Sequence, residues 1–202
     1  MYDRGVDPVN AFVLAGGKSS RMGQDKAFMQ LGGRSLLQRA LELAKTVAGA
    51  PWIVGSAAKF AAFAPVVEDV YPECGPLGGI HAALSRTASE LNLMIAVDLP
   101  FLQPDFLKYL LSRSRESGAM VAVPRAGGRL QPLCGVYRQD FAAVAERSLR
   151  AGMNRIDPLF AEVHTCIIEP DELKQNGFSE QQFSNVNTRQ DWEAASLLLP
   201  SQ

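Results

Sequence analysis

Residue types that build many common functional sites are scarce in this chain of 202 residues. Only three cysteines and two histidines are present, and the cysteines lie far apart at Cys74, Cys134 and Cys166 without any C-x-x-C pair. This scarcity argues against a structural zinc site. An odd number of cysteines fits reduced thiols and, with no secretory signal peptide in view, predicts a cytoplasmic location.

Long apolar runs and an excess of one charge are also missing. No apolar stretch approaches the length that a helix needs to span a bilayer. The first ten residues, MYDRGVDPVN, are polar and lack the apolar region of a signal peptide. The formal net charge is −1, which gives no support for nucleic-acid binding. The sequence therefore predicts neither a membrane nor a nucleic acid as a partner.

The length and the composition suit one α/β domain that spans residues 1–202. The hydrophobic content of 47% is ordinary for a globular protein. A chain of this size buries roughly 70% of its unfolded surface and needs no disulfide or metal to fold. We find no internal repeat, low-complexity tract or interdomain linker.

Apolar runs alternate with amphipathic stretches along the chain. The expected strands are Ala11–Leu14, Trp52–Val54, Val66–Val67, Leu93–Val97, Met120–Val123, Leu133–Tyr137 and Cys166–Ile168. The expected helices are Ser35–Ala48, Ala57–Phe63, Gly78–Ser85, Pro104–Ser114, Phe141–Arg150 and Thr188–Leu199, and the polar segment Lys174–Phe183 is expected to be a surface loop. This alternation predicts a doubly wound, mostly parallel sheet.

The most informative segment is LAGGKSSRMGQDK, from Leu14 to Lys26, which directly follows the first expected strand. Paired glycines allow a tight turn and close approach of the backbone to a ligand. Exposed amides together with the cations Lys18, Arg21 and Lys26 suit a triphosphate. The spacing is neither that of a Walker P-loop nor that of the dinucleotide-binding fingerprint. We therefore expect a long loop, rather than a helix terminus, to surround the phosphates.

Candidate site residues follow the ends of three expected strands: Gly16 after the first, Asp69 after the third and Asp98 after LMIAV. Ligands bind beyond the carboxyl ends of the strands in such sheets, so these residues should lie together. Asp98 suits Mg²⁺, which binds through one or two carboxylates plus phosphate oxygens. The alternative for Asp98 is a turn or helix-capping aspartate. The alternative for Lys26 is a surface lysine opposite Asp25.

These motifs resemble those of the molybdenum cofactor guanylyltransferases, a family of nucleotidyltransferases. The LAGG form of the first motif and its RMGQDK ending are similar to that family's signature. GPLGGI (Gly75–Ile80), VDLPFL (Val97–Leu102), QPLCGVY (Gln131–Tyr137) and FSNVNTRQDW (Phe183–Trp192) follow in the family's order. The resemblance runs from about Ala11 to Trp192. One departure is Arg189, which stands where the family usually has proline.

The resemblance implies a Rossmann-like nucleotidyltransferase fold and Mg²⁺-dependent transfer of GMP from GTP to the terminal phosphate of molybdopterin, with release of pyrophosphate. It implies catalytic roles for Arg21, Lys26 and Asp98, with Asp98 as the metal ligand. The implied GTP-binding residues are Leu14, Ala15, Gly16, Gly17, Arg21, Gly23, Lys26, Asp69, Gly75, Gly78, Gly79 and Asp98. Asn185 and Asn187 are implied to lie near the acceptor or the metal. The family further suggests transient contacts with other molybdenum cofactor proteins.

Several alternatives remain open at the level of sequence. A related cytidylyltransferase would carry LAAG, so LAGG favours guanine over cytosine. Asp69 suits either the guanine edge or a ribose hydroxyl, since a carboxylate accepts hydrogen bonds from both. Asn187 or Thr188 could simply cap the last helix. A protein of another class, a nucleotide-binding or cofactor-transferring module without turnover, would use the same pocket.

Overall fold

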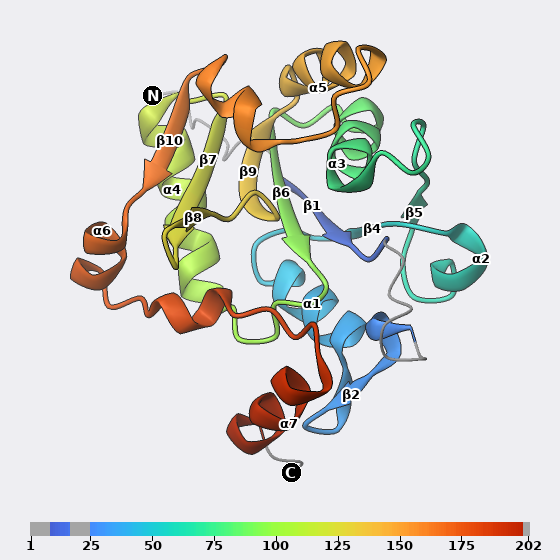
Figure 1. The fold of residues 1–202 in the computed structure, drawn as a ribbon, viewed down its shortest axis with the longest axis vertical. Coiled ribbons are helices and arrows are strands. Elements are labelled where there is room, and N and C mark those ends of the chain that lie inside the picture. The colour runs from blue at the N-terminus through green and yellow to red at the C-terminus, as the bar shows by residue number, and fades with distance from the viewer. Residues whose placement is uncertain (1–8, 17–24, 200–202) are drawn as a thin grey trace, which may run out of the picture.

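The computed structural model describes residues 9–16 and 25–199, which form a central sheet with helices on both faces (Figure 1). The strands of the main sheet are β1 (Val9–Leu14), β4 (Trp52–Val54), β5 (Val66–Val67), β6 (Leu91–Ala96), β7 (Val121–Ala126), β8 (Arg129–Leu130), β9 (Cys134–Arg138) and β10 (Thr165–Ile168). Their order across the sheet is β10-β7-β9-β6-β1-β4-β5, and β8 pairs with β7. A short second sheet joins β2 (Gln30–Leu31) to β3 (Arg34–Ser35).

The sheet is mostly parallel, as predicted. β1 pairs in parallel with β4 and β6, β4 with β5, and β7 with β10. Strand β9 runs antiparallel to both of its neighbours, β6 and β7, and β8 is antiparallel to β7. The carboxyl ends of β1, β4 and β6 therefore meet at one edge of the sheet.

Two helical layers cover the sheet. α1 (Leu36–Lys45) and α4 (Pro104–Ser117) pack on one face, and α3 (Gly75–Arg86) and α5 (Phe141–Arg150) pack on the other. Side chains alternate between the two faces along β1, so that Ala11 and Val13 join the first core and Phe12 the second. Every residue of β6 is buried, which agrees with the interpretation of LMIAV as a central strand.

Local signals set several of the helix ends. Ser35 and Gln38 form a capping box at the start of α1, in which each side chain bonds the other residue's backbone N–H. Thr188 and Asp191 form the same arrangement at α7 (Arg189–Leu198). Gly118, with φ of 62°, ends α4. The remaining helices are α2 (Ala57–Phe60), α6 (Pro170–Gln175), η2 (Lys26–Phe28), η3 (Asp157–Ala161) and η4 (Glu180–Phe183).

The interpretation of Lys174–Phe183 as a surface loop is wrong at both of its ends. The segment begins within α6 and ends within η4. Phe183 is 5% exposed and its ring meets Phe106 of α4 edge-on, with centroids 5.0 Å apart. Phe178 contacts the same ring at 5.4 Å. Two aromatic anchors thus hold a segment of polar composition against the core, and burial of those rings outweighs the polar character of their neighbours.

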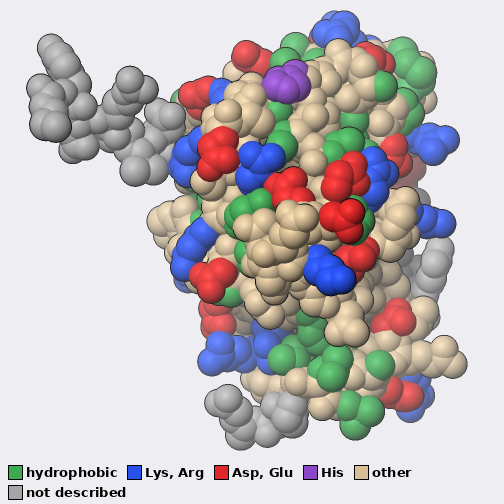
Figure 2. Space-filling view, turned by 90° about the vertical axis from the view of Figure 1, so that its left-hand side faces the viewer, with side chains coloured by type: hydrophobic (Ala, Val, Ile, Leu, Met, Phe, Trp, Pro, Cys, Tyr) green, Lys and Arg blue, Asp and Glu red, His purple; other side chains and the backbone are tan. Residues whose placement is uncertain are grey.

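Side chains of both charges lie together on one face of the molecule (Figure 2). Acidic and basic side chains are interspersed on the face over β10, α4 and α6 (Figure 2), where ion pairs join Arg113 to Glu172 and Arg125 to Glu169. This face carries no one-sign surface for nucleic acid. Among the described residues, no helix combines the length and the apolar character that crossing a membrane requires.

Candidate active site

A cavity of about 610 Å³ opens at the carboxyl ends of β1, β4 and β6. Ligands bind at this edge in open parallel sheets. The predicted site residues among its described lining are Leu14, Ala15, Gly16, Lys26, Asp69, Gly75, Gly79, Asp98 and Asn187. Residues that are far apart in the sequence therefore meet where the strand ends predicted. No histidine or cysteine is found among the described lining residues.

The backbone at the end of β1 lines the cavity, but its N–H groups already have hydrogen-bond partners. The N–H groups of Ala15 and Gly16 both donate to the Val54 carbonyl, at 3.0 and 3.1 Å. The Leu14 carbonyl accepts from the Val97 N–H at 3.1 Å. The expectation of exposed amides is wrong for Ala15 and Gly16, because pairing with β4 continues past the end of β1. Both residues still line the cavity.

Asp98 follows β6 and is fixed at three points. Its Oδ2 accepts a hydrogen bond from Lys26 Nζ at 3.0 Å, and its Oδ1 accepts one from Asn185 Nδ2 at 2.9 Å. Its backbone carbonyl accepts from the Val186 N–H at 3.0 Å. The Asp98 carboxylate does not cap α4, whose N-cap is Gln103. The capping half of the alternative is therefore wrong, whereas the turn half is confirmed, because Asp98 lies in a turn. The Asp98 side chain also lines the cavity.

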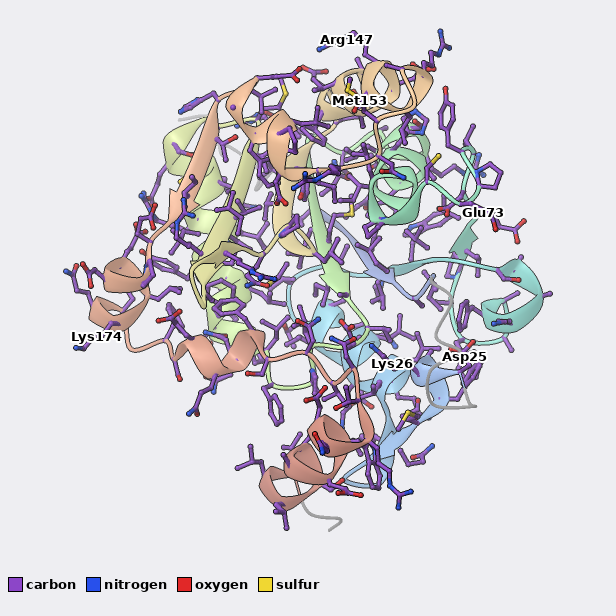
Figure 3. All side chains as sticks on the ribbon, viewed as in Figure 1. Asp25, Lys26, Glu73, Arg147, Met153 and Lys174 are labelled. Atoms are coloured by element: carbon purple, nitrogen blue, oxygen red, sulfur yellow. The ribbon has the colours of Figure 1, made fainter. Side chains whose placement is uncertain are left out.

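Lys26 begins η2 directly beside the carboxyl end of β6 (Figure 3). The side chains of Lys26 and Asp98 are only 15% and 17% exposed, so their ion pair is shielded from water more than the other ion pairs between described residues. Lys26 Nζ also donates to Asn187 Oδ1. Asp25 instead pairs with Lys59, at 2.7 Å. The alternative of a surface lysine opposite Asp25 is wrong.

Asn185 and Asn187 both reach the Lys26–Asp98 pair from the segment that leads into α7. Val186 between them is 1% exposed and packs into the core, and the two amides contact the Lys26–Asp98 pair. Of the two, Asn187 lines the cavity. Capping of α7 falls to Thr188, whose hydroxyl accepts from the Asp191 N–H at 3.1 Å. The side chain of Asn187 therefore lines the cavity and does not cap α7. The spacing of the two asparagines predicted that they share a side of the segment, and it left their partners open.

The opposite end of the cavity is formed by the end of β5 and the start of α3. Partial burial raises the pKa of the Asp69 carboxyl above its usual range. An added Cβ at Gly79 would lie 3.1 Å from Val54 Cγ1 and 3.5 Å from Asp69 Oδ1. A side chain there would press on Val54 and fill the space beside Asp69, so glycine keeps this end of the cavity open. Gly75, with φ of 64°, allows the chain to turn into α3 at its rim.

Gly78 lies outside the cavity lining and is buried within α3. An added Cβ at this position would come within 2.9 Å of the Tyr71 carbonyl oxygen. Gly78 therefore allows close packing of α3 against the preceding loop. The predicted residues Gly17, Arg21 and Gly23 fall outside the described residues.

The cavity contains lining residues that the sequence did not single out. Val54, Pro76, Val97 and Leu133 supply apolar surface, and Glu73 adds a carboxylate at the rim. The apolar residues carry no chemical signal in a linear sequence. Glu73 has φ of 63°, a left-handed conformation uncommon outside glycine, which no sequence pattern predicts.

The donor set around Asp98 fits a hard divalent cation that is completed by a ligand's oxygens. Asp98 Oδ2 and Asn187 Oδ1 both accept hydrogen bonds from the Lys26 ammonium, so two oxygens already lie beside one positive charge. No group of three or more His, Cys, Asp or Glu side chains in the described ranges is arranged to hold a metal. Mg²⁺ typically combines one or two carboxylates with phosphate oxygens and water. Asp98 would hold it, with the remaining ligands coming from a substrate.

Comparison with known proteins agrees with this geometry. The MobA-like NTP transferase domain matches residues 11–164. The chain belongs to this family of nucleotidyltransferases. A probable molybdenum cofactor guanylyltransferase of Pelotomaculum thermopropionicum is 35% identical over 188 residues, covering 92% of this chain and 91% of the relative. A second, from Carboxydothermus hydrogenoformans, is 33% identical over 90% of this chain and 91% of its own length.

Solved structures of MobA-like proteins and of other nucleotidyltransferases share the fold. Molybdopterin-guanine dinucleotide biosynthesis protein A from Archaeoglobus fulgidus superposes with a TM-score of 0.83 and 25% identity, over 94% of this chain and 97% of that structure. The Asn185–Asn187 segment lies beyond the match to the MobA-like domain, which ends at residue 164. The site of this member of the family is thus completed by a segment outside the matched domain.

Proposed function

We propose that this MobA-like protein transfers GMP from GTP to the terminal phosphate of molybdopterin, releasing pyrophosphate and forming the guanine dinucleotide. The observation that carries the proposal is the Lys26–Asp98 pair at one end of a cavity whose other end holds Asp69. The Lys26–Asp98 pair suits phosphates and a metal, and Asp69 suits a base or a ribose. The names of the relatives from Pelotomaculum thermopropionicum and Archaeoglobus fulgidus support the choice of guanine and of a molybdopterin acceptor.

The chemistry proposed for this site needs positioning and charge stabilisation more than proton transfer. A phosphate nucleophile is already ionised near neutral pH, which agrees with the absence of histidine from the described cavity lining. Lys26, together with Arg21 from the first loop, would stabilise the charge that spreads over the phosphate oxygens during transfer. Asp98 would hold Mg²⁺, which supplies further charge neutralisation at the phosphates when bound. Alignment of the acceptor phosphate with the α-phosphate of GTP in the cavity would supply the remaining rate enhancement.

The end of the cavity near Asp69 is proposed to receive the guanosine. A carboxylate accepts hydrogen bonds from the guanine N1–H and amino group, or from a ribose hydroxyl. Gly79 leaves room beside Asp69, and the apolar surface of Val54 and Pro76 suits a flat ring. Asn185 and Asn187 are proposed to lie between this nucleotide and the acceptor, because they meet the Lys26–Asp98 pair.

A product assay tests the proposal. The purified full chain is incubated with Mg²⁺, molybdopterin and each of the four nucleoside triphosphates, and pyrophosphate release and dinucleotide mass are measured. We expect turnover with GTP and a product that carries GMP. Preference for CTP would replace guanylyl by cytidylyl transfer. Pyrophosphate release at background with every nucleotide and acceptor would indicate a binding module without turnover.

A further inference from the structure

One positive charge in this site stands where a metal would be expected. The Lys26 ammonium lies between Asp98 Oδ2, at 3.0 Å, and Asn187 Oδ1. These oxygens come from segments that are far apart in the sequence, and Lys26 itself comes from a third. The arrangement brings one cation to two oxygen atoms at the edge of the cavity.

The second carboxylate oxygen and the backbone carbonyl of Asp98 also accept hydrogen bonds. Oδ1 accepts from Asn185 Nδ2 at 2.9 Å, and the backbone carbonyl of Asp98 accepts from the Val186 N–H. The carboxylate is therefore held in a fixed orientation, with Oδ2 turned toward Lys26. An ammonium at Oδ2 weakens the binding of a divalent cation to the same oxygen, because the two positive charges repel at that distance.

The Lys26 side of the arrangement is also held from two directions. Asp25 caps η2 by accepting from the Ala27 N–H at 3.2 Å, which fixes the start of η2. The indole N–H of Trp192 in α7 donates to the Gln30 carbonyl at 3.2 Å, which ties α7 to the strand that follows η2. Asn187, just before α7, is thereby kept beside Lys26. The C-terminal segment thus sets where the ammonium lies.

We propose that Lys26 is the internal counter-ion of Asp98 in the nucleotide-free protein, and that Asn187 is a positioning residue that holds it there. The inference rests on the proposed function, because it assigns Lys26 a second partner, the phosphates of a nucleotide. A triphosphate carries more negative charge than one carboxylate and so draws the ammonium away from Asp98. Only then do Asp98 Oδ2 and Asn187 Oδ1 become available to a metal. The protein consequently has low affinity for divalent metal until a nucleotide is bound.

Binding of Mn²⁺ alone tests the inference on the full chain. Mn²⁺ prefers the same oxygen ligands as Mg²⁺, and its free fraction is measured by electron paramagnetic resonance without any nucleotide. We expect Lys26→Met to bind Mn²⁺ at least about tenfold more tightly than the unmodified protein, because a charge within a few ångströms shifts carboxylate equilibria by that much. Lys26→Arg keeps the charge and should bind as weakly as the unmodified protein. Adding GTP should narrow the difference between Lys26→Met and the unmodified protein.

Lys59→Met is the matched control, since Lys59 pairs with Asp25 at the same rim but its side chain is 55% exposed. Its Mn²⁺ affinity should stay at the value of the unmodified protein. Lys26→Gln, which keeps a donor toward Asp98 and Asn187, replaces Lys26→Met if the latter does not fold. Equal Mn²⁺ affinity in the unmodified protein and the neutral variants would overturn the inference, as would an equal gain in Lys59→Met or a difference that GTP leaves unchanged. The nucleotide-free measurements need no acceptor or turnover, so their failure is separate from failure of the product assay.

Discussion

Replacing Phe183 by alanine tests two contributions of the C-terminal segment, namely its packing on the core and the placement of Asn185 beside Asp98. Phe183 is 5% exposed, and its ring meets Phe106 at an interplanar angle of 84°. Truncating a buried phenylalanine costs about 3–5 kcal/mol, of which the edge-to-face pair supplies roughly 0.5–1.5 kcal/mol. Each kcal/mol lowers the Tm of a chain of this size by about 2–4 °C. We therefore expect Tm to fall by roughly 6–20 °C in Phe183→Ala.

The same substitution should also affect the site, because Asn185 follows Phe183 by two residues and bonds Asp98 Oδ1. A displacement of about 1 Å at a reacting group costs up to about 10²-fold in rate. We expect kcat for pyrophosphate release to fall by about tenfold to a hundredfold at a temperature well below the transition, where the variant stays folded. Circular dichroism during urea unfolding supplies the stability, and the product assay supplies kcat.

Phe178→Ala is the control for this experiment. Phe178 meets the same Phe106 ring, with centroids 5.4 Å apart, and also contacts Tyr109. It is separated from Asn185 by more residues than Phe183 is. Its loss should lower stability and leave kcat of the folded protein nearly unchanged. If the two variants lost kcat equally, or if Phe183→Ala lost stability alone, the proposed link between the aromatic anchor and Asp98 would be refuted.

Three further substitutions test other parts of the reasoning. Asp98→Ala should lower the rate of pyrophosphate release by roughly 10²–10³ while far-UV circular dichroism stays native; near-normal turnover would contradict the role of Asp98. Gly78→Ala should cost about 1–3 kcal/mol in urea unfolding, because its Cβ would meet the Tyr71 carbonyl, and an unchanged midpoint would contradict this packing. Asp69→Asn should be more stable than the unmodified protein near neutral pH and no more stable in acid. The pKa of Asp69 is raised in the folded protein, so ionisation of this carboxyl lowers the free energy of unfolding as pH rises through that pKa. A stability gain of Asp69→Asn that occurred only in acid would contradict this reasoning.

The succession of strands and helices along the chain and the place of the cavity could largely be predicted from the sequence, whereas the order of the strands across the sheet was not predicted. Leu93–Val97 is apolar throughout, and a strand buried on both faces needs that composition. Gly16, Asp69 and Asp98 each follow an apolar run, and parallel strands bring their carboxyl ends to one edge. The predicted range Phe141–Arg150 coincides with α5, because its apolar face and the following glycine are both local signals.

The contacts inside the site could not be predicted in the same way. The sequence indicated Lys26, Asp98, Asn185 and Asn187 separately, but nothing in it showed that Asp98 pairs with Lys26 rather than capping a helix. It also suggested exposed amides at Ala15, whose N–H instead bonds Val54 of the neighbouring strand. Partners of this kind are set by strand pairing and by which segments pass over the sheet.

The sequence by itself therefore determined the strands, the helices and which residues stand at the strand ends, because periodicity, capping and turn chemistry act over a few neighbouring residues. Tertiary structure alone decided that Asn185 and Asn187 reach residues about 90 and 160 positions earlier in the chain. Burial of Phe183 and Val186 fixes that approach, and such burial depends on the whole core rather than on local sequence. Hydrogen-bond geometry then decides which atom of Asp98 meets which partner, because a hydrogen bond tolerates only a few tenths of an ångström.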